Sequence, residues 1–318
     1  MRNRFQYEVA TGRTTLPAAV IISLIIWAVT YSDKWELVPF IIGGLTTYSL
    51  IELNTTFALI RTRTSLPACF FVLFYSVSLF LHNYGNGECW VLLLLTTLMF
   101  GLLRSYDSRF ASTNIFHSFL CIGISCLIEP SICLLVPVIY ICMAMLRSLS
   151  LKTFFAGIIG FGLPFWFIIG YDSINWHELG FNVSSANNTD MFRSLYGFKE
   201  VFNWNVAQYS DVSITQWLSL GCVSFLSLFS GVMAFAHSYK DKVRTRIIIR
   251  VVILMGTYIT LIMLVKPVTI NSLLPTQIAL GGVLYGYIMA LISNRFTFVF
   301  MILSFILIAS IAILNFLI

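Results

Sequence analysis

The stretch that decides the fold runs from Phe296 to Leu314, FTFVFMILSFILIASIAIL, and it contains no charged residue. An α-helix rises about 1.5 Å per residue, so this stretch is nearly as long as the hydrocarbon core of a bilayer is thick, about 30 Å. A strand of an outer-membrane barrel would alternate apolar and polar residues, whereas nearly every position here is apolar. Residues 154–167 have the same pattern. Both stretches therefore predict membrane-spanning helices.

The composition extends this prediction to the whole chain. Of the 318 residues, 58% are apolar or aromatic and only 10% are charged, and the mean hydropathy is +0.90. A soluble domain carries about a quarter charged residues, so a water-soluble fold is excluded. No repeat or Gly/Ser linker divides the chain, so we expect one all-α integral membrane domain over 1–318. Eleven helices are predicted, at 15–31, 38–60, 66–82, 89–104, 112–128, 131–147, 153–171, 215–236, 247–265, 275–292 and 296–317.

The distribution of charge predicts the orientation of these helices. Lys and Arg in short loops collect on the cytoplasmic side of a membrane. With the N-terminus inside, 15 of the 19 basic residues lie on the inner side, and nine of the 13 acidic residues lie on the outer side. The pattern predicts N-in and C-out. The net charge of +6 then follows from topology, and nucleic acid is not an expected partner.

Two segments outside the helices have open interpretations. Residues 172–214 form an outer loop of about 40 residues that is rich in aromatic side chains, which favour the membrane boundary. This loop is either a short amphipathic helix on the outer leaflet or a lid packed on the bundle. Residues 1–14 are either an interfacial segment or a solvated tail. The first apolar run lacks a small-residue cleavage site, so we expect an uncleaved anchor.

The sequence contains no motif of a known cofactor or metal site. None of the seven cysteines forms a CxxC pair or a spaced Cys/His set, and HExxH, GxSxG and P-loop patterns are absent. Buried cysteines acting as small apolar residues are the expected reading. No cofactor is evident, although carboxylates at the outer side could hold a divalent cation.

Polar residues inside the predicted spans are the first candidates for a binding site, because such groups are costly in a bilayer. Glu52 lies in the second span, about 13 Å deep at 1.5 Å per residue. Asn114 and His117 are three residues apart on the fifth span. A path for a transported substrate could include all three. The alternatives are hydrogen bonds between helices, or a shallower Glu52.

Carboxylates at the outer helix ends are the second group of candidates. Asp33 and Glu36 follow the first span, and Glu129 occupies a tight Glu-Pro turn between the fifth and sixth. If these ends converge, the carboxylates could serve as a general base or bind a cation. The outer cations Arg193, Lys199 and Lys266 could receive a phosphate. Solvated helix caps are the alternative interpretation of the carboxylates.

The region 116–171 carries a resemblance to a known family. It contains two helices around the turn Glu129-Pro130, an L-L-V-P sequence at 134–137, and G-x-x-G-x-G-L-P-x-W at 157–166. This region resembles the membrane module of GT-C-type glycosyltransferases, which use polyprenyl-phosphate sugars. With RTRTSLPA at 61–68 and LLRSYDS at 102–108, the chain is also similar to a family of uncharacterised polytopic inner-membrane proteins from Gram-negative bacteria.

The resemblance implies a location and an activity. The location is the bacterial inner membrane. The activity is handling of lipid-linked sugars at the outer face, with Asp33 or Glu36 as the catalytic carboxylate. Two other functions stay open: a transporter or flippase that uses Glu52, and a non-catalytic subunit that holds partner membrane proteins.

Overall fold

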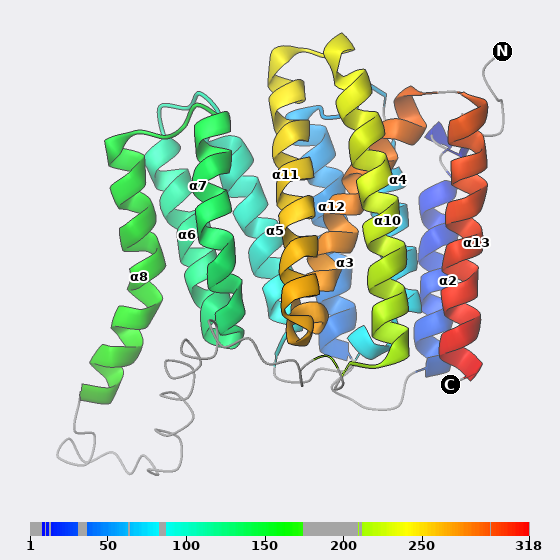
Figure 1. Ribbon diagram of the computed structural model, residues 1–318, viewed down its shortest axis with the longest axis horizontal. Helices are drawn as coiled ribbons and strands as arrows, with labels where there is room; N and C mark the ends of the chain where they lie inside the picture. Colours follow the sequence, from blue (N-terminus) through cyan, green and yellow to red (C-terminus); the bar gives the residue numbers. More distant parts are fainter. Residues whose placement is uncertain are drawn as a thin grey trace. The chain divides into compact units, whose positions relative to one another are not determined.

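The computed structural model describes residues 8–9, 11–12, 14–30, 37–62, 64–82, 87–173, 209, 212–292 and 294–317. Within these ranges the chain is helical and contains no β-strand (Figure 1). The α-helices are α2 (Thr15–Thr30), α3 (Leu37–Phe57), α4 (Leu66–Val77), α5 (Cys89–Arg104), α6 (Ala111–Ile128), α7 (Val136–Met145), α8 (Leu151–Ser173), α10 (Ile214–His237), α11 (Val243–Val265), α12 (Ile270–Leu291) and α13 (Arg295–Leu317).

All eleven predicted helices are confirmed, and the differences lie at their ends. Helix α3 ends three residues earlier than predicted, because Ala58 has a left-handed backbone with φ of 46°. Helix α4 ends at Val77 and is followed by a short 3-10 turn, Leu79–Leu81. Helix α12 begins five residues before its predicted start and contains Pro275 in its second turn. Apolar periodicity does not report such local backbone breaks.

The helices pack as two compact units. One comprises Met1–Leu93 and Ala207–Ile318, and the other comprises Leu94–Val206. We call them the first and second unit. The boundary falls within α5, so most of α5 and all of α6, α7 and α8 belong to the second unit.

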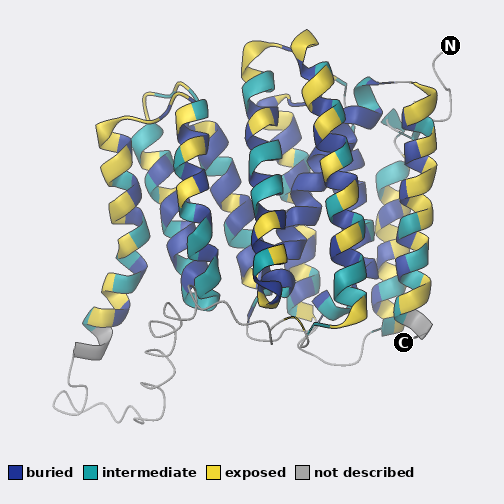
Figure 2. Cartoon of the chain, in the orientation of Figure 1, coloured by how far each residue is buried: buried dark blue, intermediate teal, exposed yellow. Residues whose placement is uncertain are grey.

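Helix α12 forms the core of the first unit. Every residue from Ser272 to Met289 is buried, and α4, α10 and α11 all pack against this helix (Figure 2). Two glycines allow the close approach of α4. A Cβ atom at Gly286 would lie 2.6 Å from Pro67 Cδ, and one at Gly282 would lie 2.8 Å from the Pro67 carbonyl oxygen. This small-residue contact is typical of membrane helices.

The second unit contains an equally close helix pair, α6 and α8. A Cβ atom at Gly160 would lie 2.5 Å from the Phe116 carbonyl oxygen, and one at Gly123 would lie 2.7 Å from that of Phe161. A Cβ atom at Gly157 would lie 2.9 Å from the Tyr140 hydroxyl oxygen. Gly157 and Gly160, the first two glycines of the family-like motif, therefore have a packing role. Gly162 has no atom within 4 Å of such a Cβ position.

Among the residues that the structure describes, seven helices are long and apolar enough to cross a membrane: α3, α6, α8, α10, α11, α12 and α13. Four shorter apolar helices accompany them. Large apolar side chains are exposed on their surfaces, including Trp166 at 78% and Val232 at 68%. Such surfaces are unfavourable in water and favourable against lipid. The chain is therefore compatible with a multi-pass membrane protein, and the N-in, C-out orientation stays a prediction.

Candidate functional site

A buried carboxylate, Asp241, lies at one end of the first unit. It follows the short turn Ser238–Lys240 that links α10 to α11, and its side chain is only 5% exposed. Arg61 Nη2 lies 2.9 Å from Asp241 Oδ1, and the Tyr287 hydroxyl donates a hydrogen bond to Oδ2. A buried carboxylate is stable only when such partners satisfy it. Asp241 thus joins α12 and the link between α3 and α4 to its own turn.

Local contacts of the α3–α4 link place Arg61 at this end. Asn54 Oδ1 accepts a hydrogen bond from the Ile60 backbone N–H at 3.2 Å, and Asn54 Nδ2 donates to the Thr64 carbonyl at 3.3 Å. The side chain of Asn54 on α3 therefore holds both sides of the α3–α4 link. The Arg61 guanidinium donates a further bond from Nη2 to the Lys240 carbonyl, and its side chain is 56% exposed. Arg61 is therefore both anchored and open to solutes.

Arg246 fixes the turn that carries Asp241. Its Nε donates to the Ser238 carbonyl at 3.3 Å, and its Nη2 donates to the carbonyls of Tyr239 at 2.7 Å and Asp241 at 3.3 Å. These carbonyls follow the last turn of α10, where helical acceptors lack backbone partners. A cation at this position also suits the negative end of the helix dipole.

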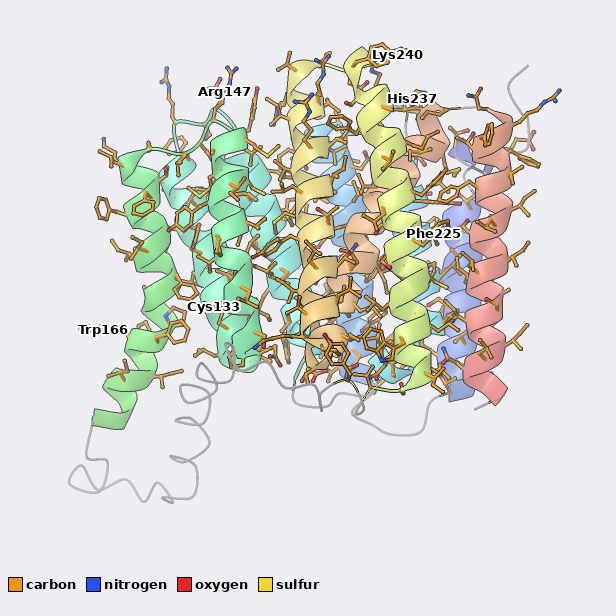
Figure 3. All side chains as sticks on the ribbon, in the orientation of Figure 1. Cys133, Arg147, Trp166, Phe225, His237 and Lys240 are labelled. Atoms are coloured by element: carbon orange, nitrogen blue, oxygen red, sulfur yellow. The ribbon has the colours of Figure 1, made fainter. Side chains whose placement is uncertain are left out.

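Two cavities are lined by Arg61, a mainly polar one and one of mixed polar and apolar lining, and we call them together the Arg61 site. The smaller, of about 320 Å³, is lined by Arg61, His237, Lys240, Asp241, Tyr287, Leu291, Ile292 and Asn294. The larger, of about 600 Å³, is lined by Thr11, Gly12, Ile51, Asn54, Thr55, Ala58, Ile60, Arg61, Thr62, Thr64 and Ser65. Figure 3 shows His237 and Lys240 at the same end of the unit.

The donor groups of the Arg61 site suit an anion. Both described hydrogen bonds of the guanidinium use Nη2, and an arginine carries further N–H donors on Nε and Nη1. Thr62 Oγ1 is buried and has no hydrogen-bond partner among the residues that the structure describes. Within that same part of the chain, no group of three or more His, Cys, Asp or Glu residues is placed to hold a metal ion. Arginine N–H groups and a hydroxyl are donors of the kind that hydrogen-bond to oxyanions.

Of the three predicted outer carboxylates, the structure describes Glu129 alone. Asp33 and Glu36 lie outside the described residues. Glu129 is half-buried between α6 and the 3-10 turn Pro130–Leu135, where its Oε1 accepts a hydrogen bond from the Ser131 backbone N–H at 3.3 Å. This contact is that of a helix cap.

The predicted binding residues are divided between the two units. Glu52 is exposed on α3, and its carboxylate accepts hydrogen bonds from Thr55 and Thr56 of its own helix at 3.3 and 3.0 Å. Asn114 is half-buried on α6, and His117 is exposed there, with its ring edge-on to Phe116. Glu52 belongs to the first unit, whereas Asn114 and His117 belong to the second.

Of the three predicted outer cations, the structure describes Lys266 alone. Arg193 and Lys199 lie outside the residues that the structure describes. Lys266 is only 5% exposed and directly follows α11, with its backbone N–H donating to the Ile262 carbonyl at 2.7 Å.

Sequence reasoning did not single out the Arg61–Asp241–Tyr287 cluster. One signal was present, because Asp241 is one of only three acidic residues on the predicted inner side, among 15 basic ones. An acid in a basic loop is a candidate for a specific ion pair. Its partners are far away in sequence, so only the fold identifies them.

Comparisons of the chain with protein-family models, with curated proteins and with solved structures gave no match. The resemblance to GT-C-type glycosyltransferases therefore stays a prediction from the motifs at 116–171.

Proposed function

We propose that the protein is an integral membrane protein that binds a lipid-linked substrate through an anionic head group, with the Arg61 site holding the head. The observation that carries this proposal is that one partly exposed guanidinium lines two cavities, a mainly polar one and one of mixed lining. Arg is well suited to phosphate because its planar N–H donors match two phosphate oxygens.

The surroundings of Arg61 favour a phosphate group over an uncharged polar ligand. Lys240 adds a second cation to the smaller cavity, and hydroxyls of Thr62, Thr64 and Ser65 line the larger one. The site lies at the ends of apolar helices, the level at which lipid head groups meet water. An acyl or prenyl chain attached to the phosphate would then lie along the apolar helix surfaces.

Binding of dodecyl phosphate to the full chain in lipid nanodiscs tests this proposal, with inorganic phosphate as the comparison. We expect Arg61→Gln to weaken dodecyl phosphate binding at least about tenfold, the loss of one charge-assisted hydrogen bond. Asp241→Asn is the matched control, because it breaks the same ion pair but keeps the cation, and it should leave binding equal or tighter. Equal binding by wild type and Arg61→Gln would refute the proposal. Tight binding of inorganic phosphate would assign the site to a free anion.

Sugar transfer at the outer face is the second candidate, and it rests on the resemblance of residues 116–171 to GT-C-type glycosyltransferases. In this reading Asp33, Glu36 and Glu129 supply the base or bind a divalent cation. The triple variant D33N/E36Q/E129Q should lose transfer from a polyprenyl-phosphate sugar. E129Q alone should keep its fold, because the amide oxygen can still accept from Ser131. An unchanged glycan profile in the triple variant would eliminate this candidate.

A further inference from the structure

A third cavity, of about 270 Å³, lies within the first unit between α10, α11 and α12. Three glycines, Gly231, Gly256 and Gly281, contribute to its wall. The α10 side chains Val232 and Phe235 also line it and are themselves exposed. The cavity therefore reaches the apolar outer surface of α10, where a membrane protein meets lipid.

One polar group of this cavity lacks a partner. Gln277 of α12 is fully buried, and its Nε2 donates a hydrogen bond to Ser227 Oγ at 2.9 Å. The Ser227 hydroxyl donates its own proton to the Ser224 carbonyl at 3.0 Å, so toward Gln277 it acts as the acceptor. This arrangement fixes the orientation of the amide. Gln277 Oε1 is left as a buried acceptor to which no described residue donates.

The residue opposite Gln277 leaves space for a ligand. A Cβ atom at Gly256 of α11 would lie 3.6 Å from Gln277 Oε1. No side chain of α11 occupies this position, because residue 256 is glycine. A buried acceptor without a donor is unfavourable, and in the hydrocarbon region bulk water does not supply one. A donor from a bound molecule would remove this cost.

The wall of the cavity defines the class of that molecule. No lining residue is charged, so phosphate, carboxylate and ammonium heads are disfavoured. The Thr257 hydroxyl already donates to the Leu254 carbonyl at 3.0 Å. Ligand pockets for whole drug-sized molecules are about 300–1,000 Å³, so this smaller cavity suits one end of a chain.

We infer that this cavity binds an uncharged long-chain alcohol that enters from the membrane. Its hydroxyl donates a hydrogen bond to Gln277 Oε1, and its hydrocarbon chain leaves the cavity past Val232 and Phe235. The single unpaired acceptor, the uncharged wall and the opening at an exposed apolar surface together select this occupant. The inference does not depend on the Arg61 site.

Photolabelling tests the inference on the full chain in lipid nanodiscs. The probe is decanol with a diazirine on its chain, and mass spectrometry maps the labelled peptides. We expect labels on α10 and α11 beside the cavity, with decanol competing about tenfold better than decyl methyl ether, which cannot donate a hydrogen bond. Equal competition by the alcohol and the ether, or labelling spread evenly over the helices, would overturn the inference.

Two variants separate the hydrogen bond from the space. Gln277→Met removes the acceptor, and we expect it to abolish the preference for the alcohol over the ether. Gly231→Leu places a side chain in the cavity without changing Gln277, and we expect it to abolish labelling there by the diazirine probe. Retained alcohol preference in Gln277→Met would contradict the inference. If either variant does not fold, the comparison of alcohol and ether on the wild-type protein still decides.

Discussion

At the scale of single residues, Asp241 has the most consequential environment. It is buried, and it satisfies its two oxygens with partners from two other segments, Arg61 and Tyr287. Arg61 is half-exposed, so the ion pair itself is partly screened by solvent. Tyr287 is buried beside the carboxylate, and its hydroxyl donates its hydrogen bond to Asp241 Oδ2.

Asp241→Ala should therefore lower the free energy of unfolding by about 1–3 kcal/mol, because it leaves the Tyr287 hydroxyl without an acceptor. Thermal unfolding of purified protein in detergent measures this change. Tyr287→Phe should restore part of the loss in the Asp241→Ala background, since it removes the stranded group. Full additivity of the two substitutions would show that the bond does not contribute.

Glu52 has the opposite character, since it is exposed and bonded only within its own helix turn. Glu52→Gln should leave both thermal stability and dodecyl phosphate binding unchanged, within about 0.5 kcal/mol for stability. A transporter that couples protons through Glu52 would instead lose uptake in proteoliposomes. The same variant thus separates the Arg61 site from the transport hypothesis.

At the scale of elements, glycines decide how close the helices approach. In the second unit Gly160 meets the backbone of α6 at Phe116, whereas Gly162, two residues later in the same motif, faces open space. Within the motif that carries the family resemblance, Gly160 is therefore required for close helix packing and Gly162 is not.

Gly160→Ala should destabilise the protein by about 1–3 kcal/mol, because the added methyl group forces α6 and α8 apart. Gly162→Ala is the matched control, and it should be neutral or slightly stabilising because alanine favours a helix. Thermal unfolding in detergent compares the two. A larger effect for Gly162→Ala would contradict the packing described for this pair.

At the scale of the whole molecule, the eleven helices predicted from the sequence are an odd number, so the two termini lie on opposite sides of a membrane if each predicted helix crosses it. The basic residues predict that the N-terminus is inside. Alkaline phosphatase fused after Ile318 should therefore be active, and green fluorescent protein fused there should be dark. A fluorescent fusion at this position would reverse the predicted sidedness and place the Arg61 site at the outer surface.

The sequence by itself determined the helical class, all eleven helices and the asymmetry of charge. It could do so because helix length, apolarity and loop charge are local properties that a bilayer selects directly. The sequence did not predict that α3 ends before Ala58 or that α12 begins before Pro275, since both boundaries depend on local backbone conformation. The tertiary structure alone brought Arg61, Asp241 and Tyr287 together and left Gln277 with an unpaired oxygen. Ion pairs and buried acceptors arise from contacts between distant helices, and in an apolar sequence the pattern of each helix carries almost no information about which neighbours it meets.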